Sequence, residues 1–163
     1  MSKVTIYGMA RSSLTRTVRI ACIEKEIPFE FHTKGIPSPG ALPTPELLQF
    51  NPFGKVPVLV QDNLVLYETS AICRYIDDAF DGPLLRPIRV DKIARMEQWI
   101  SIAMTRLDQH ILRQFVLPMV FADDETEILA ESPNVDAAFT RFQGRPSAAI
   151  TDPLLPDKIL RSA

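Results

Sequence analysis

In the first part of the chain, the spacing of apolar residues is typical of a strand, then of a helix, and then of a strand again. Residues 3–7, KVTIY, alternate and are rich in β-formers, and IPFEFHT at 27–33 has a similar texture, so both are predicted to be strands. Between them four apolar residues recur at helical spacing: Leu14, Val18, Ala21 and Cys22. They predict a helix over about 13–25. A strand, a helix and a strand in this order predict a parallel pair with a right-handed crossover.

The following segments predict a short helix, a hairpin and a further helix. Four prolines and two glycines at 34–46 predict a surface loop, and PELLQFN at its end can form one helical turn. The strands VPVLVQ and LVLYE flank a turn at Asp62-Asn63. A helix is predicted over Thr69–Phe80, because its apolar residues share one face. The order β-α-β-α-β-β-α is that of a thioredoxin-like α/β domain, predicted over 1–81.

The hydrophobic pattern changes after a linker at 81–87, DGPLLRP. Apolar residues then step by three or four as far as Pro118, which predicts one long helix. Two shorter helices are predicted at 125–130 and 135–142, and beyond them three prolines leave only the final DKILRSA weakly helical. The sequence therefore predicts an all-α second domain over 88–163.

Composition and charge narrow the classes of function. The chain has 163 residues, 46% of them hydrophobic, a formal charge of -2 and a pI near 5.7. This balance gives no basic surface for nucleic acid or anionic lipid. No apolar run approaches the ~20 residues that span a bilayer, and the N-terminus lacks the pattern of a signal peptide. We expect a soluble, cytoplasmic or organellar protein with no nucleic-acid or membrane partner.

The cysteines and histidines form no metal-binding or dithiol pattern. Cys22 and Cys73 lie far apart, and both fall on apolar helical stretches. Buried neutral thiols are therefore expected. His32 and His110 are isolated in the sequence, and no metal site is predicted.

Several motifs together resemble one enzyme family. The stretch NPFGKVPVL followed by LYETSAICRYI resembles the glutathione transferase signature, and YGMARSSLTRTVRIACIEKEIPFE is most similar to the phi class and its bacterial relatives. The resemblance covers nearly all of residues 3–80. It implies a thioredoxin-like, glutathione-binding domain followed by an all-helical domain. It further implies a cytoplasmic, homodimeric detoxification enzyme that conjugates the glutathione thiolate to a small electrophile, with glutathione as co-substrate and no other cofactor.

The resemblance gives Val56 and Pro57 a role in binding. In this family the peptide bond before the corresponding proline is cis, which turns the N–H and C=O groups of the preceding residue outward. Val56 would then pair with the cysteinyl part of glutathione as with an added strand. The alternative is that Pro57 only marks the start of an edge strand.

Glu68 and Thr69 are predicted to bind the γ-glutamyl end of glutathione. Thr69 stands at a helix N-terminus, where free N–H groups and the helix dipole favour a carboxylate. By resemblance, the Thr69 N–H and hydroxyl would hold that carboxylate and Glu68 would pair with the ammonium. The family normally has Ser after this Glu, and Thr keeps the hydroxyl. The alternative is an ordinary N-cap at Thr69, with Glu68 complementing the dipole.

The catalytic group is expected in the loop after the first strand. Alignment with the phi pattern places Ser12 at the catalytic serine, whose hydroxyl would donate a hydrogen bond to the glutathione sulfur. A thiol with a pKa of ~8.5 is only a few per cent ionised at neutral pH, and lowering that pKa by ~2 units makes the thiolate predominate. Ser13 is the alternative to Ser12 as the thiolate-stabilising residue and is also a candidate glutathione contact. A further alternative is that either serine only caps the helix. Tyr7 is expected to pack in its strand. No cysteine lies at 10–15, which disfavours dithiol redox chemistry.

The sequence departs from the family in two places. The His-Lys pair that faces the glycyl carboxylate of glutathione in the phi class falls here on Leu42 and Pro43. Lys55 is the candidate replacement, with a solvated surface lysine as its alternative reading and Lys34 as a remote substitute. The helical domain is also shorter than in the family, and the nearest match to its capping box, AITD at 149–152, lacks the capping oxygen.

These departures keep a second function open. The chain is predicted to be a glutathione transferase or, alternatively, a catalytically weak or inactive transferase-like binding or assembly module. The sequence does not identify the electrophile, because the shape of its pocket decides that.

Overall fold

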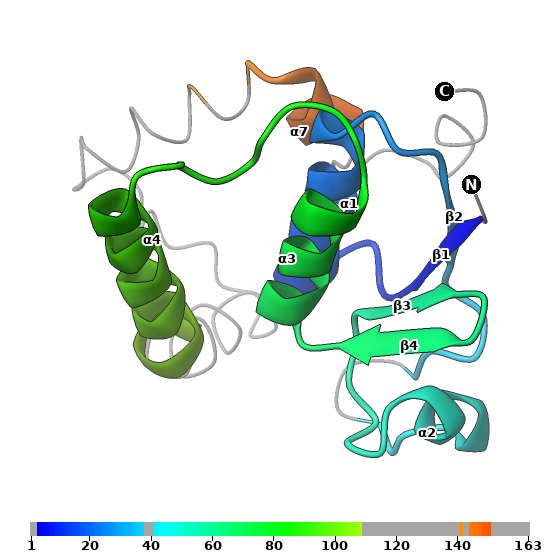
Figure 1. The fold of residues 1–163 in the computed structure, drawn as a ribbon. Helices are drawn as coiled ribbons and strands as arrows, with labels where there is room; N and C mark the ends of the chain where they lie inside the picture. The colour runs from blue at the N-terminus through cyan, green and yellow to red at the C-terminus, as the bar shows by residue number, and fades with distance from the viewer. Residues whose placement is uncertain (1–2, 38–40, 109–140, 142–143, 151–163) are drawn as a thin grey trace. The chain divides into compact units, whose positions relative to one another are not determined.

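The structure is a computed structural model that describes residues 3–37, 41–108, 141 and 144–150. Its sheet has four strands in the order β2-β1-β3-β4 (Figure 1). The strands are β1 (Val4–Tyr7), β2 (Phe29–His32), β3 (Val58–Gln61) and β4 (Leu64–Tyr67). β1 pairs in parallel with β2 and antiparallel with β3, and β3 pairs antiparallel with β4. The predicted strands, the parallel pair and the hairpin are therefore confirmed.

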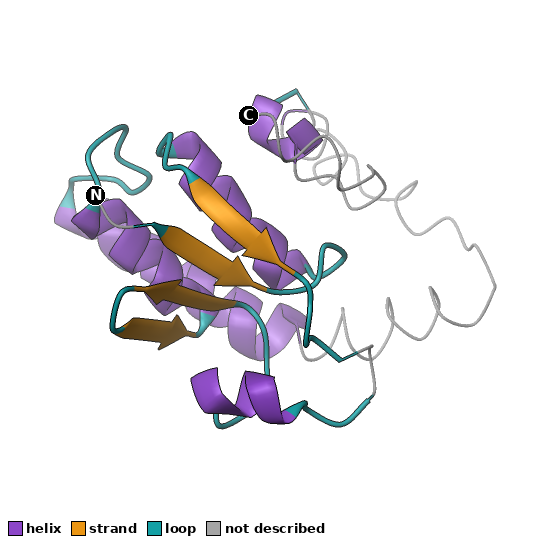
Figure 2. Cartoon of the chain, turned by 90° about the vertical axis from the view of Figure 1, so that its right-hand side faces the viewer, coloured by secondary structure: helices purple, strands orange, loops and turns teal. Residues whose placement is uncertain are grey.

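Two helices, α1 (Ser13–Glu24) and α3 (Thr69–Ala79), pack together against one face of this sheet (Figures 1 and 2). Alternation in β1 gives that face its apolar residues, because Val4 and Ile6 are buried between less buried neighbours. The rest of the core comes mainly from the two helices and β3: Val18, Ala21, Cys22, Ile27, Leu59, Ile72, Ile76 and Phe80. The predicted helical faces thus pack in the core, except that Leu14 stays only partly buried outside the core cluster.

The short helix α2 (Pro45–Phe50) begins with two local signals. The Thr44 hydroxyl accepts a hydrogen bond from the Leu47 N–H at 3.2 Å, and a proline occupies the first helical turn, where its missing N–H costs no hydrogen bond. Phe50, at the end of α2, stacks on Tyr7 with ring centroids 4.8 Å apart. Because Tyr7 points away from the face that Ile6 contributes to the core, α2 contacts the sheet on the other face.

A buried ion pair joins the C-terminal ends of α1 and α3. The Lys25 ammonium donates a hydrogen bond to the Asp77 carbonyl at 3.0 Å and lies 3.4 Å from Asp77 Oδ1. The same carboxylate oxygen accepts a hydrogen bond from the Leu85 N–H at 2.9 Å. Lys25 and Asp77 are both buried, so each charge depends on the other for compensation.

The chain divides into two compact units, one of Met1–Leu85 with Gln143–Ala163 and one of Arg86–Phe142. In the second unit α4 (Val90–Ile102) is α-helical, and residues 103–108 continue as π-helical turns, so the predicted long helix changes its hydrogen-bonding period here. Its continuation to Pro118 lies outside the described residues. The domain boundaries at 81 and 88 stay a prediction. None of the helices in the described part of the chain has the length and apolar content that crossing a membrane requires.

The helix α7 (Pro146–Ile150) corrects the expectation that only the final seven residues favour a helix. Ser147 is buried, and its hydroxyl donates to a Glu24 carboxylate oxygen at 2.7 Å. The Ala148 carbonyl accepts a hydrogen bond from the Arg16 guanidinium at 2.8 Å. Packing on α1 therefore stabilises a segment too short to be helical on its own. The predicted helices at 125–130 and 157–163, and most of 135–142, lie outside the described residues.

Candidate functional site

The sheet brings three connecting segments together at one end. Tyr7, Val58 and Tyr67 are aligned across the three neighbouring strands β1, β3 and β4. β1 and β4 both end at this line, whereas the antiparallel β3 begins there. The loop after β1, the segment before β3 and the start of α3 therefore meet at the same end of the sheet (Figure 1). These segments carry the predicted site residues: Ser12, Ser13, Lys55, Val56, Pro57, Glu68 and Thr69.

The Val56–Pro57 peptide bond is cis, which confirms the conformation implied by the resemblance. Pro57 is buried and Val56 is half-buried. The paired register of β3 begins at Val58, so Val56 lies just beyond the ladder at the edge where the three segments meet.

Asn51 builds the loop that leads to Val56, a role that sequence reasoning missed. Its side chain is 1% exposed. Its amide nitrogen donates to the Lys55 carbonyl at 2.9 Å, and its amide oxygen accepts from the Phe53 N–H at 3.0 Å. Gly54 follows with φ 60°, and a Cβ there would overlap the Pro43 ring. The signal in the sequence was Asn at the start of N-P-x-G, which is typical of an Asx turn.

Ser12 is the N-cap of α1. Its backbone is extended, with φ −74° and ψ 121°, and its Oγ accepts a hydrogen bond from the Thr15 N–H at 3.2 Å. Thr15 is fully buried beneath Gly8, where an added Cβ would overlap the Thr15 side chain. Ser12 is half-buried, whereas Ser13 is exposed and lies one residue into the helix. The capping contact therefore belongs to Ser12 and not to Ser13.

The N-terminus of α3 is built differently. Its N-cap, Glu68, has φ 73° and makes no side-chain capping hydrogen bond. The Glu68 side chain is exposed, whereas Thr69 is 4% exposed and its hydroxyl oxygen is buried with no hydrogen-bond partner among the described residues. The helix thus begins without a side-chain cap, and a hydroxyl lies unsatisfied beside its first turn.

Tyr7 packs as expected. Besides Phe50, its ring lies against the His32 ring, with centroids 5.4 Å apart. These contacts occupy the aromatic ring on the α2 face of the sheet, and Tyr7 is a packing residue of this end of β1.

The expected site for the glycyl carboxylate has no cation at the family position. The Leu42 side chain is 87% exposed, and Pro43 contacts Gly54. Lys55 and Lys34 are both exposed. The structure brings Lys55 next to Val56 in the same segment, and Lys34 follows β2, which is the other neighbour of β1 in the sheet.

The two thiols are protonated at neutral pH. Burial raises the pKa of Cys22 to about 12, with a further contribution from the nearby Cys73, and burial raises the pKa of Cys73 to about 11. Neither forms a disulfide. The prediction of buried thiols holds for Cys22, whereas Cys73 is only partly buried.

A four-stranded mixed sheet in this strand order, with two helices on one face and the β3–β4 hairpin, defines a thioredoxin-like domain. Residues 6–84 match the family model "Glutathione S-transferase, N-terminal domain". This match assigns residues 6–84 to the N-terminal domain of the glutathione transferase family, and a helical region follows them in the sequence.

Similarity to individual proteins agrees with this family. The chain is 41% identical over 102 residues to glutathione S-transferase hmp2 of Hypomyces subiculosus, a match covering 61% of this chain and 47% of that one. It is 31% identical over 156 residues to glutathione S-transferase 3 of Zea mays, a match covering 93% of this chain and 65% of that one. The chain thus spans about half to two thirds of the length of these relatives.

A solved structure shares the fold over most of the chain. The theta class glutathione S-transferase from Xanthomonas axonopodis pv. citri superposes with a TM-score of 0.65 at 24% identity, covering 93% of this chain and 72% of that one.

Proposed function

We propose that the protein is a glutathione transferase that conjugates the glutathione thiolate to a small electrophile. The observation that carries the proposal is the meeting of Ser12, Val56 and Thr69 at one end of the sheet, in a domain of the glutathione transferase family. A tripeptide with a thiol in its middle residue needs three contacts of this kind: an anion site, a backbone pair and a donor to sulfur.

The start of α3 supplies the anion site. The first N–H groups of a helix have no intrahelical partner and carry the positive end of its dipole. Because α3 has no side-chain cap, these groups remain for the γ-glutamyl carboxylate. The Thr69 hydroxyl gains a partner when it turns toward that carboxylate, and the exposed Glu68 pairs with the ammonium.

Val56 and Lys55 supply the middle and the far end of the site. Val56 lies beyond the β3 ladder, so its backbone pairs with the cysteinyl residue as an added strand would. The exposed Lys55 ammonium then attracts the glycyl carboxylate. A single flexible lysine gives a weaker anchor than a pair of donors, and we expect a correspondingly higher Kd.

Ser12 stabilises the thiolate. Its Oγ uses a lone pair to accept the Thr15 N–H, and the hydroxyl hydrogen is left to donate to sulfur. The cap and the catalytic contact are therefore compatible. The thiolate is the nucleophile, and Ser12 is an electrostatic stabiliser that lowers the pKa of the bound thiol. Ser13, exposed in the first turn of α1, is a candidate glutathione contact.

Binding and turnover test the proposal together. We would measure retention on immobilised glutathione and conjugation to a chlorodinitrobenzene by wild type, by Ser12→Ala and, to compare the two serines, by Ser13→Ala. We expect Ser12→Ala to bind glutathione and lose about 100-fold in kcat/KM, since one lost donor to a developing anion costs 10²–10³. Ser13→Ala should stay within about threefold. If wild type shows neither retention on glutathione nor turnover, the enzyme proposal is overturned. If Ser12→Ala keeps the wild-type rate, the assignment of Ser12 as the thiolate-stabilising residue is overturned.

The second candidate is a binding or assembly module without catalysis. Leu42 and Pro43 at the expected cation positions favour it. In that case wild type shows no conjugation while the protein forms a stable homodimer in analytical ultracentrifugation. For the first candidate, the glutathione transferase, we also propose a homodimer, together with a cytoplasmic location and a role in detoxification. Conjugation activity, and not the homodimer, therefore separates the two candidates.

A further inference from the structure

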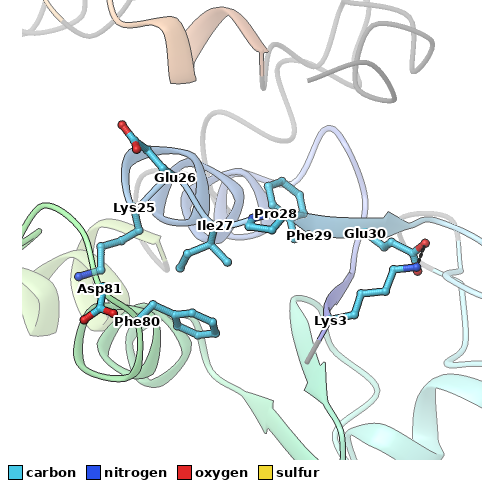
Figure 3. Close-up of a pocket in the computed structure, with 9 residues that line it drawn as sticks. All are labelled: Lys3, Lys25, Glu26, Ile27, Pro28, Phe29, Glu30, Phe80 and Asp81. Atoms are coloured by element: carbon cyan, nitrogen blue, oxygen red, sulfur yellow. Dashed lines mark ion pairs between the residues drawn. The ribbon is translucent and has the colours of Figure 1, made fainter. Parts of the chain in front are cut away.

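The two ends of α1 are packed differently. Beyond its C-terminal end lies a cavity of about 390 Å³, whose lining includes Ile27 and Phe80 (Figure 3). In the first turn of α1, by contrast, Thr15 is fully buried and lies directly beneath Gly8. The end of α1 that carries Ser12 is therefore the tightly packed one.

Gly8 is needed at this point for its small size. It is not among the glycines with positive φ, so an alanine could adopt the same backbone. A Cβ at Gly8, however, would overlap the Thr15 Cγ2 methyl and lie 2.5 Å from Thr15 Oγ1. Because atoms in good contact are ~3.5 Å or more apart, the loop and the helix would have to separate by about 1 Å.

Thr15 contributes its shape to this contact. Its hydroxyl oxygen is buried and has no hydrogen-bond partner among the described residues. A buried hydroxyl without a partner costs stability, so hydrogen bonding by this side chain does not explain the threonine. Its branched side chain fills the space under Gly8 and limits how closely the loop after β1 approaches the helix.

The same contact holds the segment that carries Ser12. The Gly8 N–H donates to the His32 carbonyl at 3.0 Å, which fixes the end of β1 against β2. The Ser12 N–H donates to the Met9 carbonyl at 3.0 Å, and Ser12 Oγ accepts the Thr15 N–H at 3.2 Å. A change in the distance between Gly8 and Thr15 therefore reaches the Ser12 hydroxyl within one helical turn.

We propose that Gly8 and Thr15 are positioning residues, whose close contact sets the place of the Ser12 hydroxyl relative to the glutathione sulfur. The inference rests on the proposed function, in which Ser12 stabilises the thiolate. Both residues act through Ser12. A displacement of about 1 Å in a catalytic contact can cost on the order of 100-fold in rate, so one added methyl group is enough to reveal the effect.

Gly8→Ala adds that methyl group. We would measure the pKa of the bound thiol from its ultraviolet absorbance, and kcat and KM for glutathione with a chlorodinitrobenzene, all in the full chain. Gly8→Ala should raise the pKa by about 1 unit above the wild-type value. Its kcat should then fall about tenfold at pH 5.5 and approach the wild-type value above pH 9, because the thiol ionises in both proteins at high pH. The KM for glutathione should stay within about threefold.

A second substitution should restore what the first one removes. Thr15→Ala takes away the two atoms nearest to the added Cβ and leaves the Thr15 Cβ at 3.0 Å from it. Gly8→Ala/Thr15→Ala should therefore recover about half of the pKa shift, whereas Gly8→Ala/Thr17→Ala, which changes an exposed threonine of the same helix, should recover none. Ile27→Val, beside the cavity, should lower the melting temperature and leave the pKa unchanged, which separates positioning from lost stability.

Failure of this inference and failure of the proposed function give different results. If the thiol of bound glutathione titrates at ~8.5 in wild type, the proposed function fails and this inference fails with it. If wild type lowers the pKa and Gly8→Ala lowers it equally, the proposed function stands and the positioning roles are overturned. Should Gly8→Ala not fold, Thr15→Ala alone carries the test. It leaves a gap under Gly8 and should raise the pKa by about 0.5 unit, and an unchanged pKa would overturn the proposal.

Discussion

The helices α1 and α3 begin at the same end of the sheet and pack side by side, but their first turns differ. Ser12 closes the start of α1 by accepting the Thr15 N–H. The start of α3 has no side-chain cap, and Thr69 places a buried hydroxyl there without a partner. A helix start that is capped by a serine presents the serine hydroxyl as a donor, whereas a helix start without a side-chain cap presents its backbone N–H groups to an anion. Two neighbouring helix ends thus provide different chemistry for one extended ligand.

The opposite ends of the same two helices serve stability. There the buried Lys25 ammonium contacts the Asp77 carbonyl and Asp77 Oδ1, and the same Oδ1 accepts the Leu85 N–H. Substitutions at the two ends should therefore separate binding from stability, and four experiments address this difference.

The largest effect is expected at the C-terminal ends. Asp77→Ala leaves the buried Lys25 ammonium uncompensated and removes the acceptor of the Leu85 N–H. We expect a loss of about 3–5 kcal/mol in the free energy of unfolding, measured in urea, with the glutathione Kd of the folded protein unchanged. The exposed neighbour serves as control, and Asp78→Ala should cost less than about 1 kcal/mol. A changed Kd would mean that the two ends are not independent.

Thr69→Val should change stability and binding in opposite directions. The variant keeps the shape of Thr69 and removes a buried hydroxyl that has no partner. Folding should gain about 1–3 kcal/mol, the cost of leaving a buried polar group unsatisfied. Glutathione binding should weaken about tenfold, since the carboxylate loses a hydrogen bond to a charged group, worth ~1.5 kcal/mol. Calorimetry that finds equal affinity would assign the carboxylate to the N–H groups alone.

Glu68 allows charge and backbone to be separated. Glu68→Gly relieves the φ of 73° and should raise stability by about 1 kcal/mol, whereas Glu68→Gln keeps the strain. Both variants lack the carboxylate proposed to pair with the ammonium, and both should weaken glutathione binding by a similar factor of about five. An affinity lost in only one of them would point to the backbone and not to the charge.

The smallest effect concerns the thiols between the helices. The pKa values of Cys22 and Cys73 are raised to about 12 and about 11, above the ordinary value of 9.0. The folded protein therefore keeps protons that the unfolded chain releases, so this contribution is complete well below pH 9, begins to fall above about pH 8, and is lost as the pH rises toward 11–12. Between pH 8 and 9, wild type should lose about 0.7 kcal/mol more than Cys22→Ala/Cys73→Ala in urea unfolding. Equal slopes would show that the thiols titrate normally.

The sequence predicted the elements whose signals are local. The hairpin was defined by two β-rich runs around Asp62-Asn63, and α1 by four apolar residues at helical spacing. The helix α7 was missed because PSAAI has no pattern of its own and depends on contacts with Glu24 and Arg16. The π-helical turns at 103–108 were also missed, since the apolar period does not distinguish hydrogen bonds to i−4 from those to i−5.

The site residues were named from motifs, but their conformations required the fold. The motif put a serine before α1 and a threonine at the first position of α3 without distinguishing how the two helix starts are capped. The burial of the Thr69 hydroxyl depends on its rotamer and its neighbours, which are tertiary features.

The pKa of the bound glutathione thiol tests the central claim most directly. It can be measured from thiolate absorbance in the ultraviolet as the pH of the binary complex is varied, in wild type and in Ser12→Ala. The account predicts a pKa about 2 units below the free value of ~8.5 in wild type, and a return toward ~8.5 in Ser12→Ala. A thiol that titrates near 8.5 in the wild-type complex, or a lowered pKa that survives the loss of the Ser12 hydroxyl, would contradict it.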